Sequence, residues 1–206
     1  NGYVYISPVG VPDPEEIKII GEGEARVIGL IPGQIATESL TYQISDDDIP
    51  DIGRDILKVV VASRYDNTRV GVGLVHGLQM REGAIASSVA HDGHHLIAVG
   101  TSDDEILKVC SEVIRKRGGM ACIHDGESMI LPLSFAGLMA EAPYEEVYTW
   151  LRHLNQLVRL TGSVKNPFMY LSFLSLTVIP ALRITPMGVF DGHAFAQVPL
   201  FVSKDT

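Results

Sequence analysis

The chain has 206 residues, of which 46% are hydrophobic and 20% are charged, so its composition is that of a folded globular protein and not of a disordered one. Its 16 Lys and Arg residues and 25 Asp and Glu residues give a formal net charge of −9 at pH 7, so we expect neither nucleic acid nor an anionic membrane as a partner. The longest apolar stretch, residues 169–182, is interrupted by Pro180 and is shorter than the roughly 20 residues that cross a bilayer, so we expect no transmembrane helix.

The first 24 residues are rich in proline and glycine around two short apolar pieces. We interpret residues 1–24 as a linker or edge segment that precedes one domain over residues 25–206. The chain begins with Asn1 and without a basic, apolar leader, so we expect a processed protein or a piece of a longer polypeptide.

Short apolar runs separated by turn residues predict a series of strands in the first half of the chain. The predicted strands cover residues 27–31, 56–62, 70–78, 84–89 and 96–99. An exposed loop is expected around the aspartates at 46–48, which separate the first two strands. Strands spaced this closely are typical of hairpins.

Residues 102–117 carry the clearest helix signal. Ser102 and Glu105 have the spacing of a capping box, and Gly118 follows as a terminating glycine. The apolar positions recur at helical spacing, at Ile106, Val109, Val113 and Ile114.

A second unit of the same kind follows. Strands at 120–123 and 128–133 are joined through Asp125 and Gly126, which predict a hairpin turn. A helix then begins at Pro143 and ends before Gly162. Its predicted buried stripe consists of Val147, Leu151, Leu154 and Val158.

The order strand, strand, helix is therefore expected twice. It predicts an α/β chain of the α+β type, in which helices pack on one face of a mixed sheet built from hairpins. The two cysteines, Cys110 and Cys122, lie in apolar surroundings and cannot form a disulfide framework, so we expect free thiols in a reducing cytoplasm.

The densest polar cluster carries three histidines at the tip of one predicted hairpin. Asp92 and Gly93 suit the centre of a two-residue turn, which would make His91 and His94 a cross-strand pair with Cβ atoms roughly 5 Å apart. Two imidazoles are weak metal candidates, because Zn, Mn and Fe sites take at least three ligands, so Asp92 or His95 would have to join or another segment of the chain would have to supply the rest. A solvent-exposed tip and the wall of a binding pocket are the two alternatives.

Two other sequence patterns lack a feature that their chemistry needs. The glycines at 71, 73 and 77 do not form a dinucleotide fingerprint, because a strand and not a helix is expected after them. A strand that runs close to another backbone explains them better. Ser87 and Ser88 lack the glycines of a nucleophile elbow, so we expect no covalent hydrolase.

Several longer motifs are similar to one known family. They are residues 31–35 (IPGQI), 83–92 (GAIASSVAHD), 131–139 (LPLSFAGLM), 166–174 (NPFMYLSFL) and 198–201 (VPLF). Together they resemble the C-terminal domain of microbial adenine deaminases, in order from about Arg26 to Val202.

The resemblance implies a purine-salvage hydrolase that converts adenine and water to hypoxanthine and ammonia. It also implies manganese or iron, held by an amidohydrolase barrel that precedes this domain in the same polypeptide, and a cytoplasmic homo-oligomer. The family's His-x-His metal pair has no counterpart here, and a barrel alone takes about 250 residues, so no catalytic residue and no cofactor are expected in this chain.

The family usually reads His-Asp-Ser-His-Asn at the hairpin tip, whereas Gly93 and His95 stand in two of those positions here. The expected substrate-proximal residues are Ser88, His91, Asp92 and His94. We expect the domain to complete the active-site wall and the oligomer contacts. A stand-alone purine-binding or regulatory module that lacks the barrel is the alternative, and a self-sufficient metal hydrolase is a third hypothesis.

Overall fold

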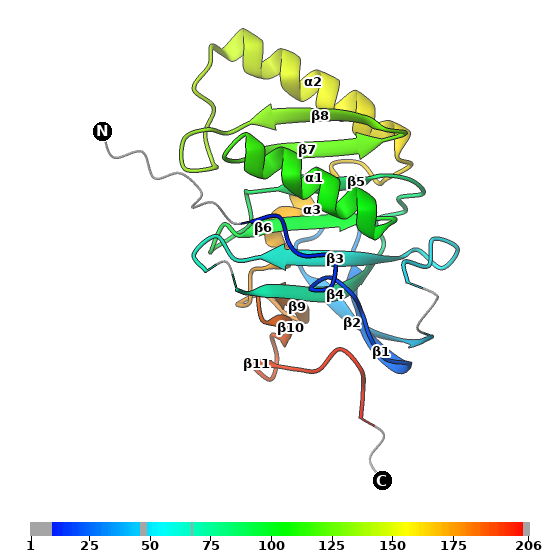
Figure 1. Cartoon of the computed structure of the whole chain (residues 1–206). Coiled ribbons are helices and arrows are strands. Elements are labelled where there is room, and N and C mark those ends of the chain that lie inside the picture. The colour runs from blue at the N-terminus through cyan, green and yellow to red at the C-terminus, as the bar shows by residue number, and fades with distance from the viewer. Residues whose placement is uncertain (1–9, 46–48, 67, 204–206) are drawn as a thin grey trace.

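A computed structural model of the chain describes residues 10–45, 49–66 and 68–203 (Figure 1). Residues 1–9 of the predicted linker and the aspartates at 46–48 lie outside this range. Among the described residues, no helix is long and apolar enough to cross a membrane. Ile17, which precedes the first strand, is fully buried.

The centre of the structure is a mixed sheet in the order β2-β1-β4-β3-β6-β5-β7-β8. Its strands are β1 (Gly23–Leu30), β2 (Thr37–Ile44), β3 (Ile56–Ala62), β4 (Val70–His76), β5 (Ala84–Ser87), β6 (Leu96–Gly100), β7 (Gly119–His124) and β8 (Glu127–Pro132). Within the described part of the chain, β1 and β4 pair in parallel and the other neighbours pair antiparallel.

In the described ranges, three helices pack on this sheet: α1 (Asp103–Arg115), α2 (Tyr144–Leu160) and α3 (Pro167–Leu174). A smaller antiparallel sheet consists of β9 (Leu182–Thr185), β10 (Gly188–Asp191) and β11 (Ala196–Gln197). The predicted α+β class is confirmed, and the repeated order occurs as β5-β6-α1 and β7-β8-α2.

The prediction that the helices share one face of the sheet is wrong. In Figure 1, α1 lies in front of the sheet and α3 behind it. Successive strand residues point to opposite faces. Ala84 and Ala86 of β5 therefore pack in the cluster with α1, whereas Ile85 packs in the cluster with α2 and α3. The central strands are buried on both faces, which is why they consist of continuous apolar runs.

The two predicted helices begin and end close to where their capping residues indicate. Ser102 is the N-cap of α1, and its Oγ accepts a hydrogen bond from the backbone N of Glu105 at 3.3 Å. Pro143 is the N-cap of α2. The predicted stripe of α2 is partly wrong, because Leu151 is 37% exposed and Leu157 is buried in the core.

The glycines of β4 make room for the second sheet. A Cβ atom on Gly71 would lie 1.9 Å from the carbonyl oxygen of Thr185 and 2.6 Å from the backbone N of Gly188. One on Gly73 would lie 3.0 Å from Cδ1 of Ile184. The explanation of these glycines as a close approach between backbones is confirmed at Gly71, whereas Gly73 makes room for side chains of the second sheet.

One threonine of β2 ties this early strand to residues far along the chain. Thr37 Oγ1 donates a hydrogen bond to the carbonyl oxygen of Leu182 at 2.7 Å. The backbone N of Thr37 donates to Pro180 at 3.2 Å, and the backbone N of Ala181 donates to the carbonyl oxygen of Thr37 at 3.1 Å. The second sheet is thereby fixed across the β1–β2 end of the main sheet.

Candidate functional site

The histidine cluster occupies the connection between β5 and β6, at residues 88–95. The predicted two-residue turn is wrong, because pairing between β5 and β6 already ends at Ser87 and Ile97. The longer connection instead contains a turn in which the backbone N of His94 donates to the carbonyl oxygen of Ala90 at 2.6 Å. We call residues 88–95 the histidine loop.

His91 and His94 nevertheless lie side by side, although not as a cross-strand pair. Their ring centroids are 5.3 Å apart, with an angle of 66° between the planes. The ring of His91 also lies 5.0 Å from that of Phe173 in α3, and its backbone N donates to Ser172 at 2.8 Å. Helix α3 therefore supports the histidine loop from one side.

Partial burial favours the neutral form of two of the loop imidazoles. Desolvation lowers the pKa of His94 below its usual value of 6.5, and electrostatic repulsion from His91 and Arg64 lowers it further. Loss of water and then Arg64 likewise lower the pKa of His95. Among the described residues, buried Nδ1 of His94 has no hydrogen-bond partner. Neutral imidazoles both donate and accept hydrogen bonds, which suits recognition of a heteroaromatic ring.

Arg64, which follows β3, is a site residue that the sequence analysis missed. Only 7% of it is exposed. Its guanidinium donates to the carbonyl oxygens of His94 at 3.3 Å and Ala136 at 2.8 Å. Its backbone N donates to Nδ1 of His95 at 3.3 Å, and its guanidinium carbon lies 5.7 Å from the ring centroid of Tyr65.

Ser88 is the first residue of the histidine loop and is fully buried. Its Oγ accepts a hydrogen bond from the backbone N of Gly119 at 2.8 Å and donates to the carbonyl oxygen of Gly137 at 2.6 Å. Its hydroxyl thus joins three segments of backbone, and its proximity to a substrate stays a prediction.

Asp92 is the exposed residue of the four predicted site residues. With Gly93, His95 and Ser175 it lines a small hollow of about 210 Å³ beside the turn between β9 and β10. The buried Oγ of Ser175 has no hydrogen-bond partner in the described part of the chain. The hollow extends the polar surface of the histidine loop toward the second sheet.

The donor set of the histidine loop does not fit a metal ion. In residues 10–45, 49–66 and 68–203, no three His, Cys, Asp or Glu side chains are grouped so that they could hold one. His91 and His94 would supply two ligands, and His95 uses its Nδ1 to accept a hydrogen bond from Arg64. Metal sites of the expected kind take at least three protein ligands.

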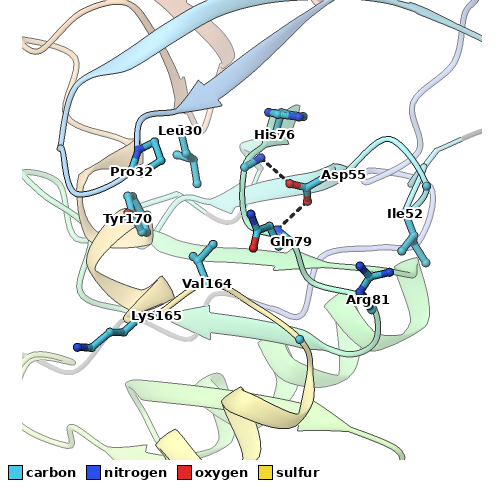
Figure 2. A pocket seen from close by; sticks show the side chains of 13 residues that line it. Leu30, Pro32, Ile52, Asp55, His76, Gln79, Arg81, Val164, Lys165 and Tyr170 are labelled. Atoms are coloured by element: carbon cyan, nitrogen blue, oxygen red, sulfur yellow. Dashed lines mark hydrogen bonds between the residues drawn. The ribbon is translucent and has the colours of Figure 1, made fainter.

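A larger cleft of about 900 Å³ lies at the other end of the sheet (Figure 2). The histidine loop follows β5 and lies next to Arg64, just after β3, whereas the cleft contains Asp55, just before β3, and His76, at the end of the antiparallel β4. The histidine loop and the cleft are therefore at opposite ends of the strands.

The cleft is lined by polar side chains from separate loops. Figure 2 shows the carboxylate of Asp55 bound to the connection that follows β4, where Oδ2 accepts from the backbone N of Gly77 at 3.0 Å and Oδ1 accepts from that of Gln79 at 2.7 Å. Arg81 and Lys165 lie toward its two sides. The sequence gives no local signal for this cleft, because its residues are far apart in the chain.

Comparison with known proteins gives one consistent result. The family model for the adenine deaminase C-terminal domain matches residues 34–196. The chain is 53% identical over 191 residues to an adenine deaminase of Methanoculleus marisnigri, which covers 93% of this chain and 37% of that protein. It is 51% identical to an adenine deaminase of Methanoregula boonei, with 93% and 34% covered, and 43% identical to adenine deaminase 2 of Carboxydothermus hydrogenoformans, with 91% and 34% covered. The chain spans about a third of the length of these relatives.

Proposed function

The chain belongs to the adenine deaminase C-terminal domain family, and from this premise we propose that it is the C-terminal domain of an enzyme that hydrolyses adenine to hypoxanthine and ammonia. Its own part would be to complete the wall of the active site with the histidine loop. The observation that carries this proposal is the identity of 53% to a protein named for that activity, over nearly the whole of this chain.

The chemistry of the histidine loop supports a role beside a purine. Adenine presents ring nitrogens that accept hydrogen bonds, an amino group that donates them and a flat π-surface. Paired, half-buried imidazoles next to Phe173 offer matching donors, acceptors and ring faces. They would orient the base and exclude water, while the groups that carry out the hydrolysis would lie in the preceding part of the polypeptide.

The experiment is adenine turnover by the complete polypeptide that carries this chain. His91→Ala and His94→Ala should each lower turnover at least about tenfold, while the melting temperature stays the same. His153→Ala is the matched control, because His153 is exposed on α2. Wild-type turnover in both loop variants would contradict the active-site wall.

We also propose that manganese or iron is held by an amidohydrolase barrel elsewhere in the same polypeptide, since the histidine loop does not offer enough ligands. The 206-residue chain alone, dialysed after exposure to Mn²⁺, should retain well under one equivalent in elemental analysis. The complete polypeptide should retain stoichiometric metal. Stoichiometric metal on the chain alone would contradict this assignment.

Cytoplasmic location and assembly into a homo-oligomer belong to the same proposal.

Mass measurement of the native product, detected with an antibody against this chain, should give a polypeptide several tens of kDa larger than the chain itself, since a barrel adds about 250 residues. A product no larger than the chain would favour the alternative, a purine-binding module. Adenine binding to the isolated chain would then be the activity to measure.

A further inference from the structure

We infer that Arg64 is a positioning residue, which fixes the histidine loop to the loop at residues 133–140 so that the two form one rigid wall. The inference rests on the proposed function for its effect on turnover, but its geometric part is independent of that function. We call residues 133–140 the facing loop.

The contacts of Arg64 join the two loops directly. One terminal nitrogen of the guanidinium donates to His94 in the histidine loop, and the other donates to Ala136 in the facing loop. A planar guanidinium holds two carbonyl oxygens in a fixed geometry, which the single ammonium group of lysine cannot do. The backbone N of Arg64 adds a third contact, to the ring of His95.

Two side chains donate hydrogen bonds to successive carbonyl groups of the facing loop. Arg64 binds the carbonyl oxygen of Ala136, and Ser88 binds that of Gly137. Ala136 and Gly137 both have left-handed backbone conformations, with φ of 57° and 73°. A left-handed conformation is costly for alanine. Backbone hydrogen bonds between Phe135 and Met139 close the turn from within, and Arg64 and Ser88 add contacts to it from outside.

The charge of Arg64 does not serve an ion pair within the described chain. None of the carboxylates in the described ranges forms a salt bridge with it. Burial of a cation without a counter-ion costs free energy. Arg183, the other deeply buried arginine, binds four carbonyl oxygens and so has more compensation. The cost at Arg64 is consistent with a residue kept for the geometry that it imposes.

Hydrogen exchange on the complete polypeptide tests the geometric part. Arg64→Ala and Arg64→Lys should both increase exchange at least about threefold in peptides covering the histidine loop and in those covering the facing loop. Arg69→Ala is the control, because Arg69 is exposed and pairs only with nearby Asp66 in the described structure. Loosening of one loop without the other, or of neither, would overturn the inference.

Adenine turnover tests the consequence. Arg64→Ala should lower turnover about tenfold, and methylguanidinium should restore part of it, whereas methylammonium should not. A variant that only weakens folding would not show this selective rescue. In the His91→Ala background, Arg64→Ala should add little further loss, because both changes act on the same wall. A full additional tenfold loss would show that Arg64 acts by another route and would overturn the inference.

The two proposals can fail separately. If His91→Ala leaves turnover unchanged while Arg64→Ala loosens both loops, the active-site wall is wrong and the positioning role of Arg64 stands. If His91→Ala lowers turnover while neither loop loosens in Arg64→Ala or Arg64→Lys, the active-site wall stands and the role of Arg64 is wrong.

Discussion

The hydroxyl of Ser88 donates a hydrogen bond of 2.6 Å to the carbonyl oxygen of Gly137, a residue 49 positions further along the chain. The same oxygen accepts from the backbone N of Gly119 at 2.8 Å. One buried side chain thus joins the end of β5, the start of β7 and the facing loop. Its removal should therefore affect stability before it affects recognition.

Ser88→Ala should lower the free energy of unfolding by about 1–3 kcal/mol, because a buried N–H group and a buried carbonyl group lose their partner. Urea unfolding of the 206-residue chain measures this. Ser111→Ala, on the exposed side of α1, is the control and should change it by less than about 0.5 kcal/mol. Equal stability of the two variants would show that Ser88 is not the junction described.

Gly71→Ala should destabilise the chain by about 1–3 kcal/mol or more, since the new methyl group would meet backbone atoms of the β9–β10 turn and not a flexible side chain. Gly53→Ala is the matched control, because its Cβ would lie 3.4 Å from the nearest atom, an ordinary contact. Thermal unfolding distinguishes them. A stable Gly71→Ala variant would contradict the close approach of the two sheets.

The thiols should be inert in the folded chain. Burial raises the pKa of Cys110 to about 12, and burial with the nearby Glu105 carboxylate raises that of Cys122 to about 12. At pH 8 the thiolate, which is the reactive form, is only about one part in ten thousand of each group. A thiol reagent should therefore label neither cysteine within minutes in buffer and both in urea. Rapid labelling of Cys110 without urea would contradict the packing of α1 on the sheet, and rapid labelling of Cys122 would contradict that of α2 and α3.

Stability should fall as the pH is lowered below 6.5. The pKa values of His94 and His95 are lower in the folded chain than their ordinary value of 6.5, so the unfolded chain binds more protons in that window. Their contribution is complete above pH 6.5 and is lost as the pH falls toward their folded pKa values. The aspartates with lowered pKa values titrate below 3.8, outside this window.

Urea midpoints at pH 7.5 and 5.5 measure this effect. His95→Asn should reduce the difference between the two midpoints, because asparagine can accept the hydrogen bond of Arg64 but does not titrate. His153→Asn, on the exposed face of α2, should leave the difference unchanged. Midpoints that do not depend on pH between these values would contradict the burial of the two imidazoles.

Local signals predict the central fold well. The apolar run at residues 56–62 coincides with β3, and Ser102 caps α1 as its sequence indicates. Asp125 and Gly126 form the turn between β7 and β8 with φ of 48° and 76°, which is the conformation that this pair favours. Each of these features depends on residues that are neighbours in the chain.

Features that depend on distant residues were missed. β2 is an edge strand in which only the two end residues, Thr37 and Ile44, are buried, so it has little apolar patterning. α3 is apolar on all sides and shows no helical period. The period of a helix also does not reveal which face of a sheet it will cover, and so α1 and α2 were expected on the same face.

In the candidate site, too, local sequence predicts some residues and misses those whose partners are distant in the chain. The sequence predicts His91 and His94 as site residues because they belong to a dense cluster of polar residues, and their rings do lie together. Arg64 was missed because its partners are about 30 and 72 residues away. The cleft was missed for the same reason, since Asp55 and Lys165 come from distant loops.

The hydrogen bond between Thr37 and Leu182 can form only late in the synthesis of the chain. Their hydrogen bond spans 145 residues, so during synthesis β2 leaves the ribosome long before its partner exists. The second sheet therefore cannot pack on the main sheet until residues 180–185 emerge, and the nascent chain leaves Ile28 and Val75, which share a core cluster with Leu182 and Ile184, partly uncovered during that time. A ribosome that stalls between residues 45 and 180 would hold a chain that depends on chaperones to keep these apolar side chains from associating with other proteins.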